Sequence, residues 1–326
     1  MTTQFPPTPP LHPESAAFIA RLTRPDAPPF YALPLSLQRR SQEKMLIEFS
    51  PALTSAATMR EARMERSEAD GGPLRFRCYR PQGVADDAKL PLLCWFHGGG
   101  WTVGSLAGFD AVCRELAQLS GCAVAAIGYR QAPEHKFPAA TDDAFFALCW
   151  FATQAKALNI DAARLAVGGD SAGGNLATVA ALRCRDAGGP SLAFQLLVYP
   201  DVDKRCNSAA HFQFADGYVL TRDLLLYFRA NYLREESDCL DWRVSPLLAP
   251  SLAGLPPTLI VAASHDPLRD DGLAYGERLK AEGVAVERVE YPGMVHNFFT
   301  LGGAIPTANR AVAQAAQALR QALHPG

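Results

Sequence analysis

Leu165-Ala166-Val167-Gly168-Gly169-Asp170-Ser171-Ala172-Gly173-Gly174-Asn175-Leu176 is the stretch around which this 326-residue chain is organised. An apolar run breaks into glycines around one serine and then resumes as a helical pattern, which predicts a strand, a sharp turn and a helix with Ser171 at the apex. Gly169 and Gly173 match G-x-S-x-G, a turn in which residues without Cβ let the strand and the helix approach closely. Because a glycine-rich loop between two elements would look similar, other residues must support a role for Ser171.

Strand-like and helical runs alternate on both sides of this turn. The strand-like runs cover 74–78, 92–96, 123–129, 165–168, 194–199, 259–263 and 286–291, and the helical patterns cover 109–119, 140–158, 176–185, 272–281 and 308–323. Alternation of this kind is typical of the α/β class. It predicts a mainly parallel central sheet flanked by helices.

Two segments depart from the alternation. Residues 1–50 are rich in proline and then helical in pattern, and 201–244 contain an aromatic cluster and a helical run at 224–233 but no clear strand. Insertions in α/β folds gather at the carboxyl ends of the strands, where ligands bind. We therefore expect these segments to form a helical cap over the site. The expected division is 1–50 and 201–244 for the cap, and 51–200 and 245–326 for the two parts of the catalytic core.

The overall composition excludes several classes of function. Hydrophobic residues make up 48% of the chain, charged residues 20%, and the formal net charge is -2. Such a chain has no cluster of basic residues for nucleic acid, so we expect no nucleic-acid partner. No apolar run is long enough for a membrane span, and the first residues lack the pattern of a signal peptide. These features predict a protein without a membrane partner and with a cytoplasmic location.

The eight cysteines are scattered singly along the chain and form no C-x-x-C pair. They stand at 78, 94, 113, 122, 149, 184, 206 and 239, several of them inside apolar runs. This spacing is typical of buried free thiols in a reducing compartment. A disulfide between two of them stays open as the alternative.

A second glycine motif follows the strand-like run 92–96. His97-Gly98-Gly99-Gly100-Trp101 leaves backbone N–H groups unshielded by side chains, which suits a site that holds a developing negative charge. A phosphate cradle would use similar N–H groups. However, neither glycine cluster spells G-x-x-x-x-G-K-[ST] or G-x-G-x-x-G, so the sequence disfavours nucleotide binding.

If Ser171 is a nucleophile, it needs a base, and the base needs a carboxylate to orient it. In folds with this type of turn, the chain order is serine, acid, histidine. Two histidines follow the last strand-like runs, His296 in a loop just past a strand and His324 in the C-terminal tail. The position at a strand end favours His296 as the base.

The candidate carboxylate comes from the loop after strand-like run 259–263. Asp266 is the acid nearest to the end of that strand, where a rigid scaffold can aim it. Asp270 and Asp271 are expected to cap the next helix, because acidic side chains favour helix starts. The sequence therefore predicts Asp266 as the partner of His296.

Five stretches together resemble the hormone-sensitive-lipase-like esterases of the α/β-hydrolase superfamily. They are HGGGW at 97–101, YRQAPEHKFPAA at 129–140, GDSAGG at 169–174, DPLRD at 266–270, and His296. The resemblance runs from about residue 74 to the C-terminus. It implies the α/β-hydrolase fold with a helical cap, and hydrolysis of small-molecule carboxylic esters, usually with short acyl chains and with neither cofactor nor metal.

The resemblance also implies roles for individual residues. Ser171 would be the nucleophile, His296 the base and Asp266 its orienter. The backbone N–H groups of Gly99, Gly100 and Ala172 would form the oxyanion hole, as carried over by position.

The motif at 129–140 is expected to be structural. Arg130 and Glu134 are placed to pair or to bond the loop backbone, since charged residues in a loop are usually scaffolding. Gln131 departs from the family pattern, where leucine is usual, and is expected to be peripheral.

An ester substrate needs a pocket for its acyl or alcohol group. Candidates for its lining are Trp101, Phe212, Phe214, Tyr218 and Met294. The alternative is that aromatic residues of the cap form a small core of their own. A capped cleft favours short to medium acyl chains.

Three functional hypotheses remain at this point. The first is a serine carboxylesterase working through an acyl-enzyme, and the second is an amidase or lactonase on the same residues. The third is a small-molecule receptor that kept the fold and lost the chemistry. Such a receptor would typically lack the histidine, so the presence of His296 disfavours it. A homodimer is plausible for a chain of this size.

Overall fold

A computed structural model of the chain describes residues 8–23, 27–51 and 57–324. Its centre is an eight-stranded sheet in the order β1-β2-β4-β3-β5-β6-β7-β8. The strands are β1 (Thr58–Met64), β2 (Leu74–Arg80), β3 (Leu90–Phe96), β4 (Ala123–Gly128), β5 (Ile160–Asp170), β6 (Leu192–Val198), β7 (Thr258–His265) and β8 (Val286–Val295). The pairs β1/β2 and β2/β4 are antiparallel, and all others are parallel. The predicted α/β class with a mainly parallel sheet is confirmed.

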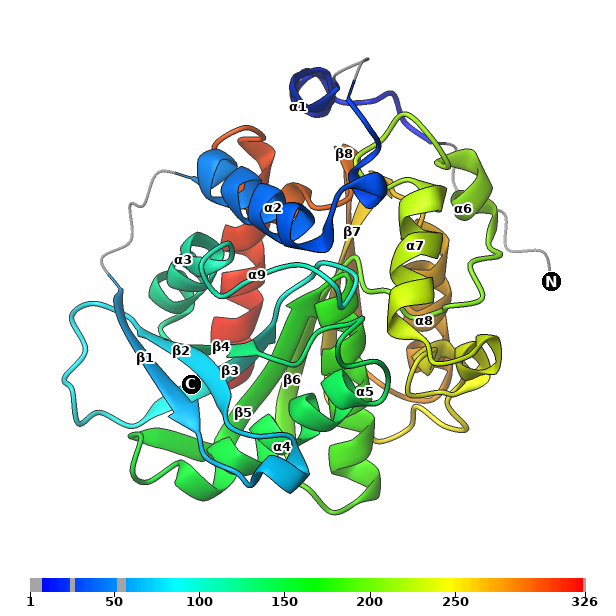
Figure 1. Ribbon diagram of the computed structural model, residues 1–326. Helices are drawn as coiled ribbons and strands as arrows, with labels where there is room; N and C mark the ends of the chain where they lie inside the picture. The colour runs from blue at the N-terminus through cyan, green and yellow to red at the C-terminus, as the bar shows by residue number, and fades with distance from the viewer. Residues whose placement is uncertain (1–7, 24–26, 52–56, 325–326) are drawn as a thin grey trace.

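Helices cover both faces of this sheet (Figure 1). One face carries α4 (Ala139–Gln154), α5 (Ala172–Asp186) and α8 (Arg269–Ala281), and the other carries α3 (Asp110–Ser120) and α9 (Thr307–Leu323). Each face has its own hydrophobic core. The sheet is therefore buried from both sides, as parallel sheets require.

Strand β3 shows how the sequence produces this layering. Every residue of β3 is buried, and successive side chains of a strand point to opposite faces. Cys94 and Phe96 lie in the core with α4 and α5, whereas Leu93 and Trp95 lie in the core with α3 and α9. This double burial explains why β3 is a continuous apolar run in the sequence.

Strand β1 was not predicted from the sequence. Its residues are mostly exposed and include Arg60, Glu61 and Arg63, so it has no apolar alternation. It pairs with β2 alone, at the edge of the sheet. A charged edge strand is a common protection against pairing with another chain, but such a strand is invisible to hydrophobic periodicity.

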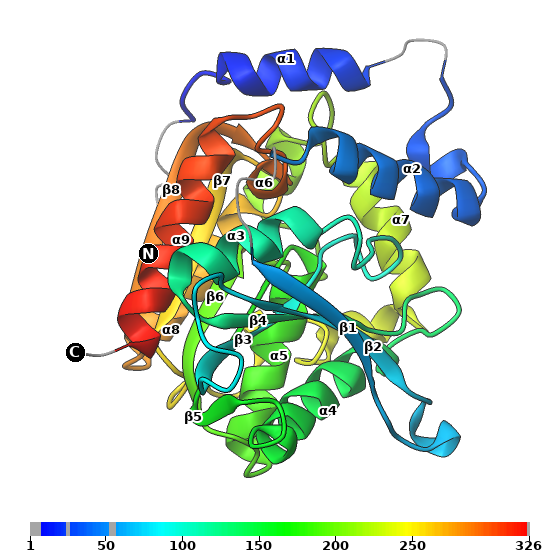
Figure 2. The same cartoon turned by 90° about the vertical axis from the view of Figure 1, so that its left-hand side faces the viewer.

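Two segments far apart in the sequence lie at the same end of the molecule. Figures 1 and 2 show α1 (Pro13–Leu22) and α2 (Leu35–Phe49) there, with α7 (Arg222–Tyr232) beside them and the short α6 (Ala209–Gln213) nearby. Gln38 Nε2 of α2 donates to Tyr227 Oη of α7 at 2.9 Å. We propose that these segments act together as the cap.

The loop after β4 is held by partners from outside the loop. Arg130 binds Asp143 of α4 at 2.7 Å, and Glu134 binds Arg39 of α2 at 2.7 Å. Gln131, expected to be peripheral, donates from Nε2 to the Val103 and Gly104 carbonyl oxygens at 2.8 and 3.0 Å. It therefore helps to hold the chain that follows the glycine motif.

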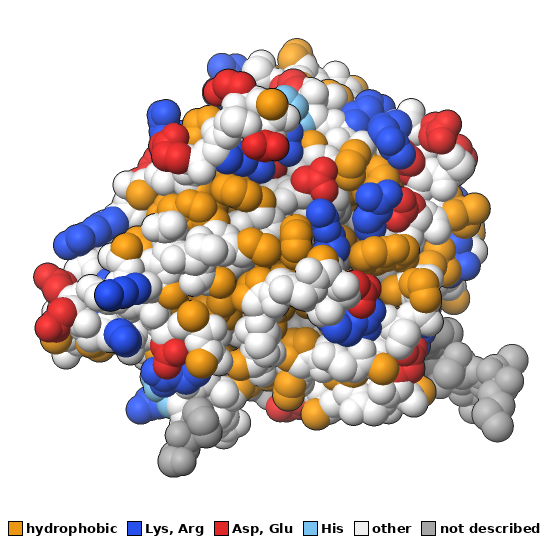
Figure 3. All heavy atoms as spheres, turned by 90° about the horizontal axis from the view of Figure 1, so that it is seen from below, with side chains coloured by type: hydrophobic (Ala, Val, Ile, Leu, Met, Phe, Trp, Pro, Cys, Tyr) orange, Lys and Arg blue, Asp and Glu red, His pale blue; other side chains and the backbone are white. Residues whose placement is uncertain are grey.

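The remaining surface and the cysteines agree with an ordinary globular chain. The face seen from below carries hydrophobic side chains interspersed with charged ones (Figure 3). In the part of the chain that the structure describes, no helix is long and apolar enough to cross a membrane. All eight cysteines fall in that part, and none of them forms a disulfide.

Candidate active site

Ser171 lies between β5 and α5 and has a backbone conformation that residues other than glycine rarely adopt, with φ of 55° and ψ of -120°. Glycines make this turn possible. A Cβ on Gly169 would collide with the Gly173 carbonyl group, and a Cβ on Gly173 would collide with the Phe96 carbonyl oxygen. Backbone strain of this kind is concentrated at functional sites, where the surrounding structure enforces it. The strand, turn and helix occur as the sequence predicts.

The structure brings Ser171, His296 and Asp266 together. His296 Nε2 lies 3.0 Å from Ser171 Oγ, and His296 Nδ1 lies 2.6 Å from Asp266 Oδ2. The other oxygen of Asp266 accepts the backbone N–H of Leu268 at 2.8 Å. All three catalytic candidates are buried, with Ser171 and His296 retaining 8% and 7% of their exposure. A serine, an imidazole and a carboxylate in this order can move a proton from the hydroxyl to the ring.

Each member of this group comes from the end of a strand. Ser171 follows β5, Asp266 follows β7, and His296 follows β8. Tyr199, which follows β6, packs its ring 4.6 Å from the His296 ring, centroid to centroid. Sequence reasoning missed Tyr199, although its place at the end of an apolar run was the available signal. His324, the other histidine considered, lies near Cys122 and takes no part.

The second glycine motif lies beside the serine. The Gly98 N–H donates to Asp170 Oδ1 at 2.9 Å, which ties the motif to the residue before Ser171. Gly99 and Gly100 have φ of 118° and 58° and line the same cavity as Ser171. Ala172 is the first residue of α5, where the helix dipole favours negative charge. This arrangement suits an oxyanion, although the role of each N–H stays a prediction.

We expect Gly100→Ala to lower kcat by about 10²–10³-fold, the effect of losing one oxyanion donor. A Cβ at this position would collide with the ring of Phe228, and the positive φ disfavours any side chain, so the loop must shift. Hydrolysis of p-nitrophenyl acetate measures the effect. Gly83→Ala is the matched control, because Gly83 also has a positive φ but open space around it. Equal losses in the two variants would contradict the assignment.

Two buried titratable groups, Asp170 and His97, form hydrogen bonds with Gly98 of the glycine motif. Burial raises the pKa of the Asp170 carboxyl to about 7, although the Gly98 N–H and the nearby His296 act in the opposite direction. Burial lowers the pKa of His97 to about 4, although its hydrogen bond with the Gly98 carbonyl oxygen opposes this. His97 therefore stays neutral in the folded protein over most of the useful pH range.

We expect Asp170→Asn to gain stability relative to the wild type as the pH rises from 4 to 8. In this window the folded carboxyl keeps a proton that the unfolded chain has lost, so the wild type loses stability as the pH rises. Asparagine does not titrate and can still accept the Gly98 N–H. The difference in unfolding free energy between variant and wild type should change by on the order of 4 kcal/mol.

Urea unfolding at pH 4, 5, 6, 7 and 8 measures this difference. The pH dependence that His97 contributes is common to both proteins and cancels. Asp161→Asn is the control, because Arg164 lowers the pKa of the Asp161 carboxyl and moves its titration below this range. A stability difference that stays constant with pH for Asp170→Asn would contradict the prediction.

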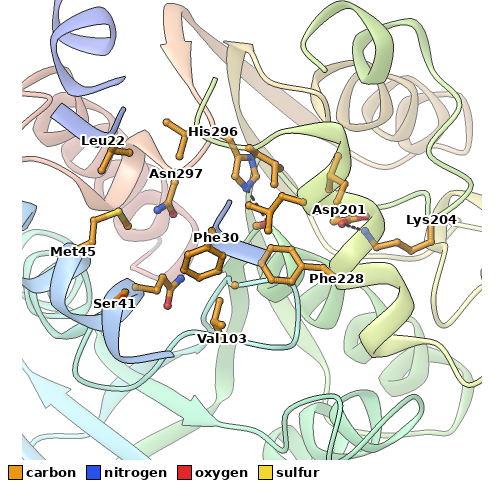
Figure 4. Close-up of a pocket in the computed structure, with 18 residues that line it drawn as sticks. Leu22, Phe30, Ser41, Met45, Val103, Asp201, Lys204, Phe228, His296 and Asn297 are labelled. Atoms are coloured by element: carbon orange, nitrogen blue, oxygen red, sulfur yellow. Dashed lines mark hydrogen bonds and ion pairs between the residues drawn. The ribbon is translucent and has the colours of Figure 1, made fainter. Parts of the chain in front are cut away.

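A cavity of about 350 Å³ opens over the serine, with His296 and Asn297 on its wall (Figure 4). Most of the wall is apolar and is supplied by the two proposed cap segments. The N-terminal segment supplies Leu22, Phe30 and Met45, and the later segment supplies Leu220, Leu224 and Phe228. The volume lies near the lower end of the range for small-molecule sites.

None of the five pocket residues expected from the sequence lines this cavity. Trp101 is fully buried and stacks on Tyr232 with 4.2 Å between ring centroids. Met294 is also fully buried, with its sulfur 3.8 Å from Ser15 Oγ. Both side chains fill the interior next to the site rather than the cavity.

The three aromatic residues of the insertion pack elsewhere. Phe214 packs against Tyr218 and His265, with ring centroids 5.4 and 5.5 Å apart. Phe212 is 61% exposed and contacts Arg222. The alternative weighed for these residues, a small core within the cap segment, describes Phe214 and Tyr218 better.

Asp270 and Asp271 occupy the first turn of α8 but do not cap it. The residue at the N-cap position is Leu268, without a side-chain cap. Asp270 Oδ2 accepts the N–H of Ala210 in α6 at 2.9 Å, and Asp270 Oδ1 pairs with Arg269 at 2.8 Å. Asp270 thus attaches the insertion to the core. Among the residues described, no cluster of three or more histidine, cysteine or acidic side chains could hold a metal ion.

Comparison with known proteins agrees with this geometry. A family model described as alpha/beta hydrolase fold matches residues 93–300. An ethyl acetate hydrolase of Pseudomonas putida is 42% identical over 259 residues, which cover 78% of this chain and 80% of the relative. A carboxylesterase of Mycobacterium tuberculosis, NlhH, is 43% identical over 252 residues, which cover 76% and 78% of the two chains.

Solved structures of ester hydrolases are similar to this chain over nearly its whole length. An ester hydrolase from the metagenome of Lake Arreo, in complex with a derivative of bipyridine phosphonate, superposes with a TM-score of 0.91 at 39% identity. The match covers 95% of this chain and 98% of that one. A thermostable esterase from Pseudomonas putida has a TM-score of 0.92 at 33% identity, with 98% and 100% covered.

Proposed function

This chain belongs to the hormone-sensitive-lipase-like group of the alpha/beta-hydrolase family and is a carboxylic ester hydrolase, and we propose that Ser171 is its nucleophile, with short- to medium-chain acyl esters as substrates. His296 is the general base and Asp266 orients it. The backbone N–H groups of Gly99, Gly100 and Ala172 bind the oxyanion.

One observation carries this proposal. A continuous relay of hydrogen-bonding atoms runs from Ser171 Oγ through the two ring nitrogens of His296 to Asp266 Oδ2, with separations of 3.0 and 2.6 Å. It lies on the wall of the cavity, next to the glycines of the second motif. The imidazole has two ring nitrogens, and here they connect a hydroxyl with a carboxylate.

The first half of the reaction forms an acyl-enzyme. Because Asp266 accepts a hydrogen bond from the Nδ1–H group of His296, the Nε2 atom is unprotonated and can take the Ser171 proton as Oγ attacks the ester carbonyl carbon. Asp266 then stabilises the imidazolium that results. The ring returns the proton to the alcohol oxygen, and the alcohol leaves.

The second half repeats these steps with water in place of the serine. His296 takes a proton from water, which attacks the acyl carbonyl carbon, and Ser171 is released with its proton. In both halves the negative oxygen accepts hydrogen bonds from the glycine motif and the start of α5. Each such donor contributes roughly 3 kcal/mol to the lowering of the barrier in comparable sites.

The cavity supports the substrate range that we propose. It is small, capped and mostly apolar, which favours short to medium acyl groups over long ones. Release of p-nitrophenol from esters running from acetate to palmitate tests this range. An optimum at palmitate would contradict it.

Two further substrates separate an esterase from an amidase and from a lactonase. A p-nitroanilide and a γ-lactone matched to the best ester report on amidase and lactonase activity. Turnover of either one in preference to the ester would replace the proposal with that activity. Inactivity on all three would favour a receptor that retains the fold.

Two further expectations stay proposals. A homodimer is proposed from the size of the chain, and light scattering of the purified protein tests it. A cytoplasmic location is proposed from the unpaired cysteines, and cell fractionation tests it.

A further inference from the structure

A buried ion pair interrupts the apolar wall of the cavity. Lys204 Nζ binds Asp201 Oδ2, and the two residues retain 0% and 2% of their exposure. Both line the same cavity as Ser171, on the opposite side from Leu22 and Met45 (Figure 4). Burying two charges against apolar surface is unfavourable unless they are well paired, so this position needs an explanation.

The backbone around this pair is fixed from two directions. The Asp201 N–H donates to the Ser171 carbonyl oxygen at 3.1 Å, and Asn175 Nδ2 donates to the Asp201 carbonyl oxygen at 2.8 Å. The Lys204 N–H donates to Ser245 Oγ at 2.9 Å. The pair is therefore held at a constant position relative to the nucleophile before any substrate arrives.

The pair does not satisfy all of its hydrogen-bonding groups. Asp201 Oδ1 is buried and has no partner within the described part of the chain. The Lys204 ammonium carries three N–H groups, one of which binds Asp201, and the centroid of the Trp101 ring lies 4.9 Å from Nζ. An unpaired buried acceptor loses its hydration without compensation.

Lys204 keeps its charge in this setting. Burial lowers the pKa of Lys204, but the attraction of Asp201 and of other nearby groups outweighs burial, and the net shift is upward. An unpaired acceptor and a cationic donor thus belong to two neighbouring residues of the cavity wall.

We propose that Asp201 and Lys204 form a recognition point for a hydroxyl group on the ester substrate, with the hydroxyl donating to Asp201 Oδ1 and accepting from Lys204 Nζ. This inference rests on the proposed function. A hydroxyl is neutral and is both donor and acceptor, which matches a pair without net charge. A carboxylate at this point would face Asp201, and an ammonium would face Lys204, so each would meet a like charge.

The hydroxyl can belong to either half of the ester. The backbone of Asp201 is hydrogen-bonded to that of Ser171 and both residues line the cavity, so we expect the recognition point to lie near the reacting carbonyl. Matched substrates distinguish the two halves. Ethyl 3-hydroxybutyrate against ethyl butyrate tests the acyl half, and 2-hydroxyethyl butyrate against ethyl butyrate tests the alcohol half.

We expect the wild type to favour the hydroxylated ester by at least about tenfold in kcat/KM in one of these comparisons, measured by pH-stat titration. Ratios near one in both comparisons would overturn the proposal. If the wild type hydrolysed none of the three esters, the proposed function would be overturned together with this inference.

The variant that tests the pair is Asp201→Asn with Lys204→Met. It removes both charges together, because a single change would leave the other charge buried and unpaired. We expect the tenfold preference to fall to near one, while the turnover of ethyl butyrate falls less than that of the hydroxylated ester. An unchanged preference would overturn the proposal. If this variant does not fold, the wild-type ratios alone decide.

A matched control lies in the same turn. Asp203 and Arg205 also form an ion pair, and neither lines the cavity. Asp203→Asn with Arg205→Met should keep the wild-type preference for the hydroxyl. Loss of the preference in this control as well would assign the effect to the turn rather than to Asp201 and Lys204, and would overturn the proposal.

Discussion

Ser171→Ala is expected to lose about 10⁶-fold in kcat on p-nitrophenyl acetate while keeping its fold, as removal of the nucleophile does in serine hydrolases with the same constellation. The hydroxyl oxygen Oγ is the only heavy atom that the substitution removes. The backbone keeps its strained conformation, because the glycines on either side and the hydrogen bond from the Ser171 N–H to the Val198 carbonyl oxygen are unchanged. The melting temperature should therefore stay close to that of the wild type.

A buried serine away from the site is the control for this variant. Ser120 lies at the end of α3, where its Oγ accepts the N–H of Cys122. Ser120→Ala should lose some stability but keep its kcat. An activity above about 1% of wild type in Ser171→Ala would mean that another group attacks the ester.

Covalent labelling gives a second measure of the nucleophile. A p-nitrophenyl phosphonate should add its phosphonyl group to the wild type, release one p-nitrophenol per chain and leave Ser171→Ala unmodified. A modified peptide without Ser171 would contradict the assignment even if the variant were inactive.

The fold could be predicted where burial leaves a pattern in the sequence. Most of each strand from β3 to β7 is buried on both faces, and these parts therefore read as apolar runs between helical patterns. The edge strand β1 has charged, exposed side chains and could not be found in this way. Periodicity reports burial, so it fails where a strand is held by backbone hydrogen bonds and by ion pairs such as Arg77–Glu61 rather than by apolar packing.

The catalytic candidates could be named because their positions follow from the sheet. Ser171, Asp266 and His296 each come just after a strand, and parallel strands bring their carboxyl ends to one edge. The cavity wall has no such rule. Its apolar residues come from helical patterns that look the same whether they face a core or a substrate.

The buried pair in the cavity illustrates a further limit. Asp201 and Lys204 stand in the run Asp201-Val202-Asp203-Lys204-Arg205, which looks like an exposed, charged turn. The structure buries Lys204 completely, and its backbone N–H donates to Ser245 Oγ in the chain that returns after the insertion. Only the tertiary structure shows that Lys204 is buried whereas its neighbour Arg205 is exposed.

Asp266→Asn is expected to lower kcat by about 10⁴-fold without unfolding the protein. The two oxygens of Asp266 accept from different donors, the Leu268 N–H at 2.8 Å and His296 Nδ1 at 2.6 Å. An amide has one oxygen only. If that oxygen stays on the Leu268 N–H, the amide NH₂ group faces Nδ1, so Nδ1 must be the bare nitrogen and the ring proton moves to Nε2. A protonated Nε2 cannot take the Ser171 proton.

In the opposite orientation the amide oxygen would face Nδ1, but the NH₂ group would then face the Leu268 N–H. Two donors would face each other, which is unfavourable. The loss should therefore appear in kcat for p-nitrophenyl acetate, with a melting temperature close to that of the wild type. Asp270→Asn is the matched control, since this buried carboxylate stands four residues later and binds Ala210 rather than the ring. It should remain within about tenfold of wild type, because it touches no reacting group. If Asp266→Asn kept more than a tenth of the wild-type kcat, His296 would not depend on Asp266 for its tautomer, and the carboxylate would be a structural partner of Leu268 alone.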